Sequence, residues 1–219
     1  MRRLIFVVAA CACMGVPALA NISINYNHAI AGDLTLTTPY SGAIVDNFDS
    51  GRPGWTYTGN GAIVTGSASG LYAAPFNSSF MSSPDATHYL TVPRNFTNGN
   101  WAMVDFGGAT YNALGLFWGS VDSYNTIQFL KGGIPVTGGT WTGSQVISPG
   151  VANGNQSAPS TNLYVNFLDV PDFDAVRFTS SQPAFELDNL AVVPVPVPAA
   201  FLLGMLGLGA AGVKLRKYA

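Results

Sequence analysis

The sequence predicts an all-β protein, an antiparallel β-sandwich, and three observations support this prediction. Between residues 21 and 193, short runs in which apolar and polar residues alternate recur along the chain. Gly, Pro, Asn, Asp or Ser closes these runs, which is typical of strands that bury one face. No stretch of this region keeps a helical apolar period over three turns, so neither a helical bundle nor a parallel α/β sheet is favoured.

The alternating runs set the expected order of elements. Strands are expected at residues 33–38, 101–106, 113–118, 126–130, 163–168, 175–179 and 184–193. Residues 119–125 form a polar turn or bulge, and loops are expected at 150–161 and 169–174. Aromatic side chains should fill the space between the sheets, among them Trp118, Phe129, Phe167 and Phe178. About 170 residues suffice for one hydrophobic core, so residues 21–193 are expected to form one domain.

Residues 1–20 have the pattern of a secretory signal peptide. Arg2 and Arg3 precede an apolar run at residues 4–16, and the small residues Ala18 and Ala20 occupy the positions that signal peptidase reads. Cleavage is therefore expected before Asn21. The run is too short to cross a membrane as a mature helix, because a span needs roughly 20 apolar residues.

Both cysteines of the chain, Cys11 and Cys13, lie inside this leader. A mature protein that begins at Asn21 therefore has no disulfide, thiolate metal site or cysteine nucleophile. One alternative stays open, because residues 8–11 loosely fit a lipoprotein cleavage box. Cleavage there would leave only residues 4–10 as the apolar run.

Residues 194–219 have the pattern of a membrane anchor. A proline-rich segment comes first, an uncharged run of Ala, Leu, Gly and Phe follows to residue 213, and Lys214, Arg216 and Lys217 close it. A transmembrane helix is expected at about residues 197–213, somewhat thin for a hydrocarbon core of roughly 30 Å. The basic tail at residues 214–219 would keep the C-terminus cytoplasmic and the β domain outside.

The order of proline motif, apolar helix and basic tail resembles the PEP-CTERM sorting signal of Gram-negative bacteria. Pro196, Val197 and Pro198 stand where that signal has Pro-Glu-Pro, so the usual glutamate is missing. The resemblance implies processing by exosortase after transient residence in the inner membrane. The cargo would then be attached to the cell surface or released, often alongside exopolysaccharide production. It covers residues 194–219 and is silent about what the β domain does.

Two weaker resemblances concern the β domain itself. The predicted sandwich resembles the jelly-roll domains of lectins and carbohydrate-binding modules. Residues 115–126 and 185–190 look like segments found in many PEP-CTERM cargo domains. Both favour the sandwich, and neither assigns an activity.

The charge of the β domain argues against nucleic acid as a partner. Between residues 21 and 193 the only cations are Arg52, Arg94, Lys131 and Arg177. All 11 acidic residues of the chain lie in the same stretch, which gives a net charge of −7. Phosphate recognition needs clustered Lys and Arg, and this domain has no such cluster.

The residues offer little for catalysis. His28 and His88 are the only histidines, and no nucleophile motif accompanies either. No P-loop, dinucleotide fingerprint or zinc-protease motif occurs. Glu186 and Asp188 lie two apart on a predicted strand and so point to the same side. They are the pair that an alternative, a secreted polysaccharide hydrolase, would use; we expect the protein not to be an enzyme.

Calcium is a second use for the carboxylates. Residues 46–51 are rich in oxygen ligands, and early and late strands often pair in jelly rolls. Asp46, Asp49, Glu186 and Asp188 could therefore meet around one structural Ca²⁺. The competing interpretation is that Asp46 and Asp49 cap turns through their own backbone.

Aromatic side chains could stack on sugar rings. Trp55 and Trp141 sit among Gly and Thr, so they are the candidates for exposure, whereas Tyr57, Trp101, Trp118 and Tyr124 are expected mostly in the core. The sequence therefore favours a non-catalytic surface or matrix protein that binds polysaccharide. The alternatives are the hydrolase and a purely structural coat protein.

Both processing events predict definite ends for the mature chain. Mass spectrometry of the protein expressed in an exosortase-containing host should find a first residue of Asn21 and a last residue near Pro198. A mature chain that keeps residues 1–20 would contradict the leader, and one that keeps residues 199–219 would contradict the sorting signal.

Overall fold

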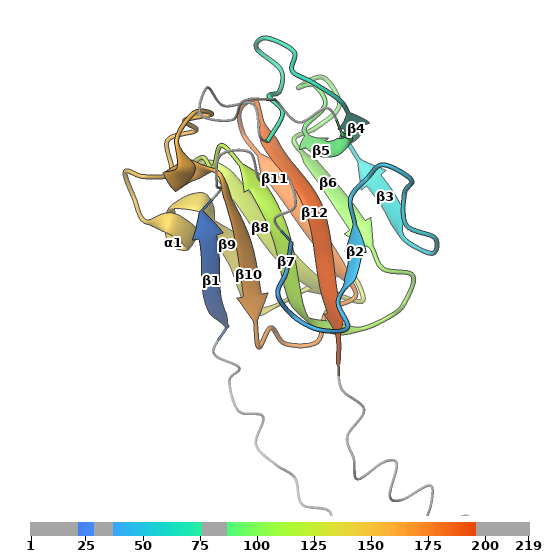
Figure 1. Ribbon diagram of the computed structural model, residues 1–219. Coiled ribbons are helices and arrows are strands. Elements are labelled where there is room, and N and C mark those ends of the chain that lie inside the picture. The colour runs from blue at the N-terminus through green and yellow to red at the C-terminus, as the bar shows by residue number, and fades with distance from the viewer. Residues whose placement is uncertain (1–21, 29–36, 76–86, 196–219) are drawn as a thin grey trace, which may run out of the picture.

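In the computed structural model, two antiparallel β-sheets pack face to face around one hydrophobic core (Figure 1). The structure describes residues 22–28, 37–75 and 87–195. The predicted signal peptide, sorting motif, transmembrane helix and basic tail lie outside these residues and stay predictions. Among the described residues, no helix has the length and apolar character needed to cross a bilayer.

The seven-stranded sheet, called sheet A, contains the first and last strands of the described chain. Its strands, in spatial order, are β1 (Ser23–His28), β10 (Leu163–Leu168), β7 (Tyr111–Gly119), β12 (Phe185–Pro194), β5 (Tyr89–Val92) and β4 (Ala62–Val64), and β2 (Ile44–Asp46) also pairs with β12.

The five-stranded sheet, sheet B, lies behind sheet A in Figure 1. Its order is β3 (Thr56–Gly59), β6 (Trp101–Asp105), β11 (Ala175–Ser180), β8 (Asn125–Lys131) and β9 (Ile134–Thr142). Two short helical segments connect the sheets on one side, α1 (Gly143–Ile147) and the 3₁₀ turn η1 (Pro159–Thr161).

The predicted strands from residue 101 onward are confirmed, with boundaries within about two residues. The run at 33–38 falls mostly outside the described residues, and its described part is not a strand. Strands β1 to β5 were not predicted. Strand β9 was not predicted either, because Pro135, Gly138 and Gly139 interrupt its sequence. It lies at the edge of sheet B, where an unpaired proline nitrogen disturbs no inner ladder.

The core is the aromatic layer that the sequence predicts. Trp118, Phe129, Phe167 and Phe178 are all fully buried between the sheets. Phe129 of sheet B meets Phe167 of sheet A at 5.4 Å between ring centroids. Phe185 at the start of β12 stacks on Trp118 at 4.4 Å and contacts Phe178 across the sandwich. These contacts fix how the two sheets face each other.

A β-bulge in β12 keeps its apolar residues on the core side. Asp188 pairs with Phe117 and Ala191 with Gly115, so two residues of β12 oppose one residue of β7. Asn189, in the bulge, has a φ of 48°, a conformation that asparagine tolerates better than most residues. Strict alternation would turn Leu190 outward; the bulge restores it to the core.

The strand directions place the two ends of the described chain far from the start of β12. Ser23 pairs with Leu168 at one end of sheet A. Because β10 pairs with β7 and β7 pairs with β12, the last residues of β12 lie at the same end of the sheet. Glu186 and Gly119 pair at the opposite end. Figure 1 shows β1 beginning and β12 ending at the lower edge of the sandwich, away from the loops at the top.

The stacked Trp118 should carry much of the core stability. Replacing it with alanine should lower the free energy of unfolding by about 3–5 kcal/mol, because the substitution leaves a cavity against Phe185. Urea denaturation would measure the change. Ile134→Ala is the matched control, since Ile134 is 71% exposed and its loss should cost no more than about 0.5 kcal/mol. Similar values for the two variants would contradict this view of the core.

Candidate functional site

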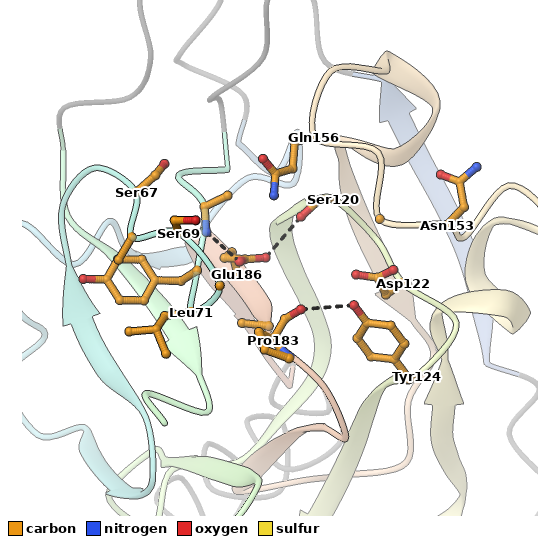
Figure 2. A pocket seen from close by; sticks show the side chains of 16 residues that line it. Ser67, Ser69, Leu71, Ser120, Asp122, Tyr124, Asn153, Gln156, Pro183 and Glu186 are labelled. Carbon is orange, nitrogen blue, oxygen red and sulfur yellow. Dashed lines mark hydrogen bonds between the residues drawn. The ribbon is translucent and has the colours of Figure 1, made fainter. Parts of the chain in front are cut away.

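A polar cavity of about 350 Å³ opens near the start of β12. The start of β12 lies at the upper end of the sandwich in Figure 1. Three connections form the walls of the cavity, at residues 67–73, 120–124 and 153–156, and the start of β12 forms its floor. We call this cavity the polar pocket. Figure 2 shows its principal side chains, among them Ser67, Ser120, Asp122, Tyr124, Gln156 and Glu186.

Glu186, the only glutamate of the sequence, lies in this pocket and is 2% exposed. Its Oε1 accepts a hydrogen bond from the backbone N–H of Ala73 at 2.9 Å, and its Oε2 accepts one from the Ser120 hydroxyl at 3.2 Å (Figure 2). No described Lys, Arg or His side chain lines the pocket to balance the charge. Burial therefore raises the pKa of Glu186 to about 7; the nearby Asp122 adds to the rise, and the two hydrogen bonds oppose it.

Asp122 supplies the second carboxyl group of the polar pocket. It lies in the turn between β7 and β8 and is 8% exposed. Burial raises its pKa above the ordinary aspartate value. The carboxylate packs directly on Gly154, where any side chain would collide with it. Gly154 also has a φ of 68°, so this position favours glycine for two reasons.

Hydrogen bonds within the loops, and from the loops to neighbouring segments, hold the pocket in shape. Ala68 and Tyr72 pair through both backbone N–H groups, at 2.9 and 3.1 Å. The backbone N–H of Ser120 donates to the Asn162 side chain at 2.9 Å, and the Tyr124 hydroxyl donates to the carbonyl oxygen of Pro183 at 3.1 Å. These contacts fix the loops before a ligand arrives, which lowers the entropy cost of binding.

The lining favours a ligand that is rich in hydroxyl groups. Carboxyl oxygens accept hydrogen bonds, serine hydroxyls both donate and accept them, and the amides of Asn153 and Gln156 also do both. Tyr72 and Tyr124 add aromatic surface to the walls. Neither histidine is among the lining residues, so no serine of the pocket has a described histidine base beside it.

The structure does not bring the four predicted calcium ligands together. Asp46 pairs with Leu190, which confirms that the early and late strands lie side by side. Directly paired residues share a face, so Asp46 points with Leu190 toward the core. Glu186 and Asp188 alternate with core residues and point to the opposite face of sheet A.

Asp46 and Asp49 already accept local hydrogen bonds. Asp46 accepts from the backbone N–H of Phe48 and from the Tyr57 hydroxyl. Asp49 accepts from the Asn47 side chain and from the backbone N–H of His88. No cluster of three or more His, Cys, Asp or Glu suited to a metal occurs among the described residues, and calcium stays a prediction.

The two predicted sugar-stacking tryptophans pack against the core. Trp55 is half-buried and meets Phe106 edge to face at 4.8 Å. Trp141 is half-buried and lies 6.4 Å from Phe167. Neither lines the polar pocket, whose aromatic groups are Tyr72 and Tyr124. A sugar-binding role for the two tryptophans stays a prediction.

Only one residue of the predicted hydrolytic pair, Glu186, lines the polar pocket. Glu186 and Asp188 do lie on the same face of β12, but only Glu186 lines the polar pocket, together with Asp122. Asp122 was missed because it lies 64 residues from Glu186 in sequence. The signal for it was the polar run at residues 119–125, which directly follows a buried strand.

The chain matched no family model, no curated protein and no solved structure.

The raised pKa of Glu186 predicts a stability that falls as pH rises. Between about pH 4.5 and pH 7, Glu186 keeps its proton in the folded protein, whereas the same residue loses its proton in the unfolded chain. The contribution of Glu186 to the free energy of unfolding is therefore largest below pH 4.5. This contribution declines toward pH 7, by on the order of 3 kcal/mol. Glu186→Gln mimics the protonated form and should remove this decline, as urea denaturation at pH 4.5, 6 and 8 would measure.

The exposed Asp172 provides the control for this experiment. Asp172→Asn also removes one carboxylate, but it should leave the pH profile of the wild type unchanged. Equal pH dependence in the wild type and in Glu186→Gln would show that Glu186 ionises normally.

Proposed function

We propose that this chain is an exported surface protein whose β-sandwich binds a saccharide in the polar pocket without turning it over. Signal peptidase would remove residues 1–20, and exosortase would process the anchor at residues 194–219 in the inner membrane of a Gram-negative bacterium. The mature protein would then act at the cell surface or in the extracellular matrix.

The strand order supports a jelly-roll, lectin-like class within the sandwich. Four neighbours in sheet A are β5, β12, β7 and β10, and four in sheet B are β6, β11, β8 and β9. From β5 onward, successive strands mostly alternate between the sheets, so each sheet is built from strands distant in sequence. Two interleaved four-stranded sets of this kind form a double Greek key.

The position of the polar pocket suits a protein anchored by its C-terminus. Glu186 stands near the start of β12, and Pro194 ends that strand at the other end of the sandwich. Eight residues of strand span about 26 Å. An anchor that follows Pro194 would therefore leave the pocket directed away from the membrane and open to polymers outside the cell.

The polar pocket carries the proposal of saccharide binding. It combines two carboxyl groups with hydroxyl and amide side chains from loops that are already fixed. A sugar presents many hydroxyl groups, and carboxylates accept hydrogen bonds from them more strongly than neutral groups do. Binding needs no further chemistry from the protein, in line with the expectation that it is not an enzyme.

One observation favours hydrolysis as the second candidate. Glycoside hydrolysis needs an acid that holds a proton near neutral pH and a second carboxylate beside it. Glu186, with its pKa near 7, and Asp122 share the same pocket. Release of reducing sugar from a bound polysaccharide, abolished in Glu186→Gln, would establish hydrolysis and exclude the purely binding role.

Loss of the Asp122 carboxylate should weaken saccharide binding. A glycan array would first select a ligand for the purified full chain, and calorimetry would then compare variants. Asp122→Asn should raise the dissociation constant about tenfold, because one charge-assisted hydrogen bond is lost. Asp172→Asn is the control, since it changes the same charge at an exposed position outside the pocket.

Two results would contradict the proposal. The first is that no saccharide binds the wild-type protein. The second is that Asp122→Asn and Asp172→Asn bind equally well. Repeating the titration in EDTA tests the predicted calcium separately, because binding through the pocket alone should survive removal of divalent ions.

A further inference from the structure

A second hollow adjoins the polar pocket at the loop of residues 67–73. It measures about 450 Å³ and shares Leu71 and Tyr72 with the pocket. Its other walls come from β4 and from Arg94 and Asn95, which follow β5. Because the two hollows meet at the same two side chains, one extended ligand can occupy both.

Arg94 is the distinctive group of this second hollow. Of the four cations in the β domain, Lys131 pairs with Asp174 at 3.4 Å and Arg177 lies over the Trp101 ring at 4.9 Å. Arg52 lines neither hollow. Arg94 is exposed, and no described carboxylate lies within ion-pair distance of it. Arg94, which has no ion-pair partner among the described residues, therefore lines a hollow in a domain of net negative charge.

The backbone that carries Arg94 is firmly held. Its N–H donates to the carbonyl oxygen of Asn60 at 2.7 Å. The buried side chain of Asn60 in turn donates to the carbonyl oxygens of Asn95 and Gly99. These bonds fix the backbone at Arg94 and just after it, which reduces the backbone entropy lost when its guanidinium meets a ligand.

The surface between the two carboxyl groups and Arg94 is apolar. Leu71 is 43% exposed and Ile63 is 41% exposed. The Tyr72 ring is steadied by an edge contact with Tyr89 at 6.4 Å. A sugar ring has apolar C–H faces that suit such a surface, whereas its hydroxyl groups suit the pocket on one side and an acidic substituent suits Arg94 on the other.

We propose that the ligand is an acidic polysaccharide chain that crosses Leu71 and Tyr72, with a neutral sugar unit in the polar pocket and an anionic group on Arg94. This inference rests on the proposed function and specifies its ligand class. The anionic group is a carboxylate or a sulfate, because the planar guanidinium can bind either through two parallel hydrogen bonds.

Three polymers test the inference on the purified full chain: neutral dextran, polygalacturonate and dextran sulfate. One or both anionic polymers should bind more tightly than dextran, and which of them does so identifies carboxylate or sulfate as the preferred group. Arg94→Ala should raise the dissociation constant for that polymer about fivefold and leave the constant for dextran unchanged. Alanine keeps the backbone N–H that bonds Asn60, so the fold should be preserved.

Arg52→Ala is the matched control, because it removes the same charge from an exposed loop outside both hollows. Equal effects of the two arginine variants, or no effect of either, would overturn the anionic subsite. Equally tight, Arg94-dependent binding of single-stranded RNA would overturn it too, since the surface would then recognise charge alone. Weaker dextran binding in Asp122→Asn with no effect of Arg94→Ala would leave the proposed function standing, whereas no saccharide binding at all would remove both.

Discussion

The fold depends on one constraint, which is that β12 must be buried on both faces. Its inner residues, including Phe185 and Leu187, form part of the aromatic core, while Glu186 and Asp188 on the outer face are also almost fully covered. The bulge at Asn189 makes this arrangement compatible with a core-facing Leu190. β12 also pairs with β7, β5 and β2, so any change in its register would displace both the core and the pocket.

The polar pocket follows from the same constraint. Burial raises the pKa of Glu186, and its carboxyl group is held by a backbone N–H and a hydroxyl, with no described cation lining the pocket. Three loops meet over it at the same end of the sandwich: the connection after β4 at residues 67–73, the turn after β7 at residues 120–124, and the segment at residues 153–156 that precedes β10. The two carboxyl groups with raised pKa values, Glu186 and Asp122, therefore lie where the loops converge. Binding residues of β-sandwiches are commonly found on such loops.

The all-β class and the strands from residue 101 onward, apart from β9, could be predicted from the sequence, but the strands before residue 101 and most of the site could not. The strands at 163–168 and 175–179 and the four core aromatics were correct, because alternation and aromatic content report directly on burial. Strand β9 was missed, since an edge position tolerates a proline that an inner strand would exclude. For the site, Glu186 was identified as a candidate, but its partner in the pocket is Asp122 rather than the nearby Asp188, and sequence proximity carries no information about which loops meet.

The sequence by itself determined the all-β class, the acidic and cysteine-free character of residues 21–193, and the predicted export and sorting signals at the two ends. Each of these is a local property of composition or pattern. The tertiary structure alone decided that Asp46 and Glu186 face opposite sides of sheet A, that Asp122 and Glu186 share one cavity, and that Arg94 borders a hollow beside it. The physical reason is that strand pairing joins residues far apart in sequence, and one bulged residue shifts the phase of every side chain beyond it.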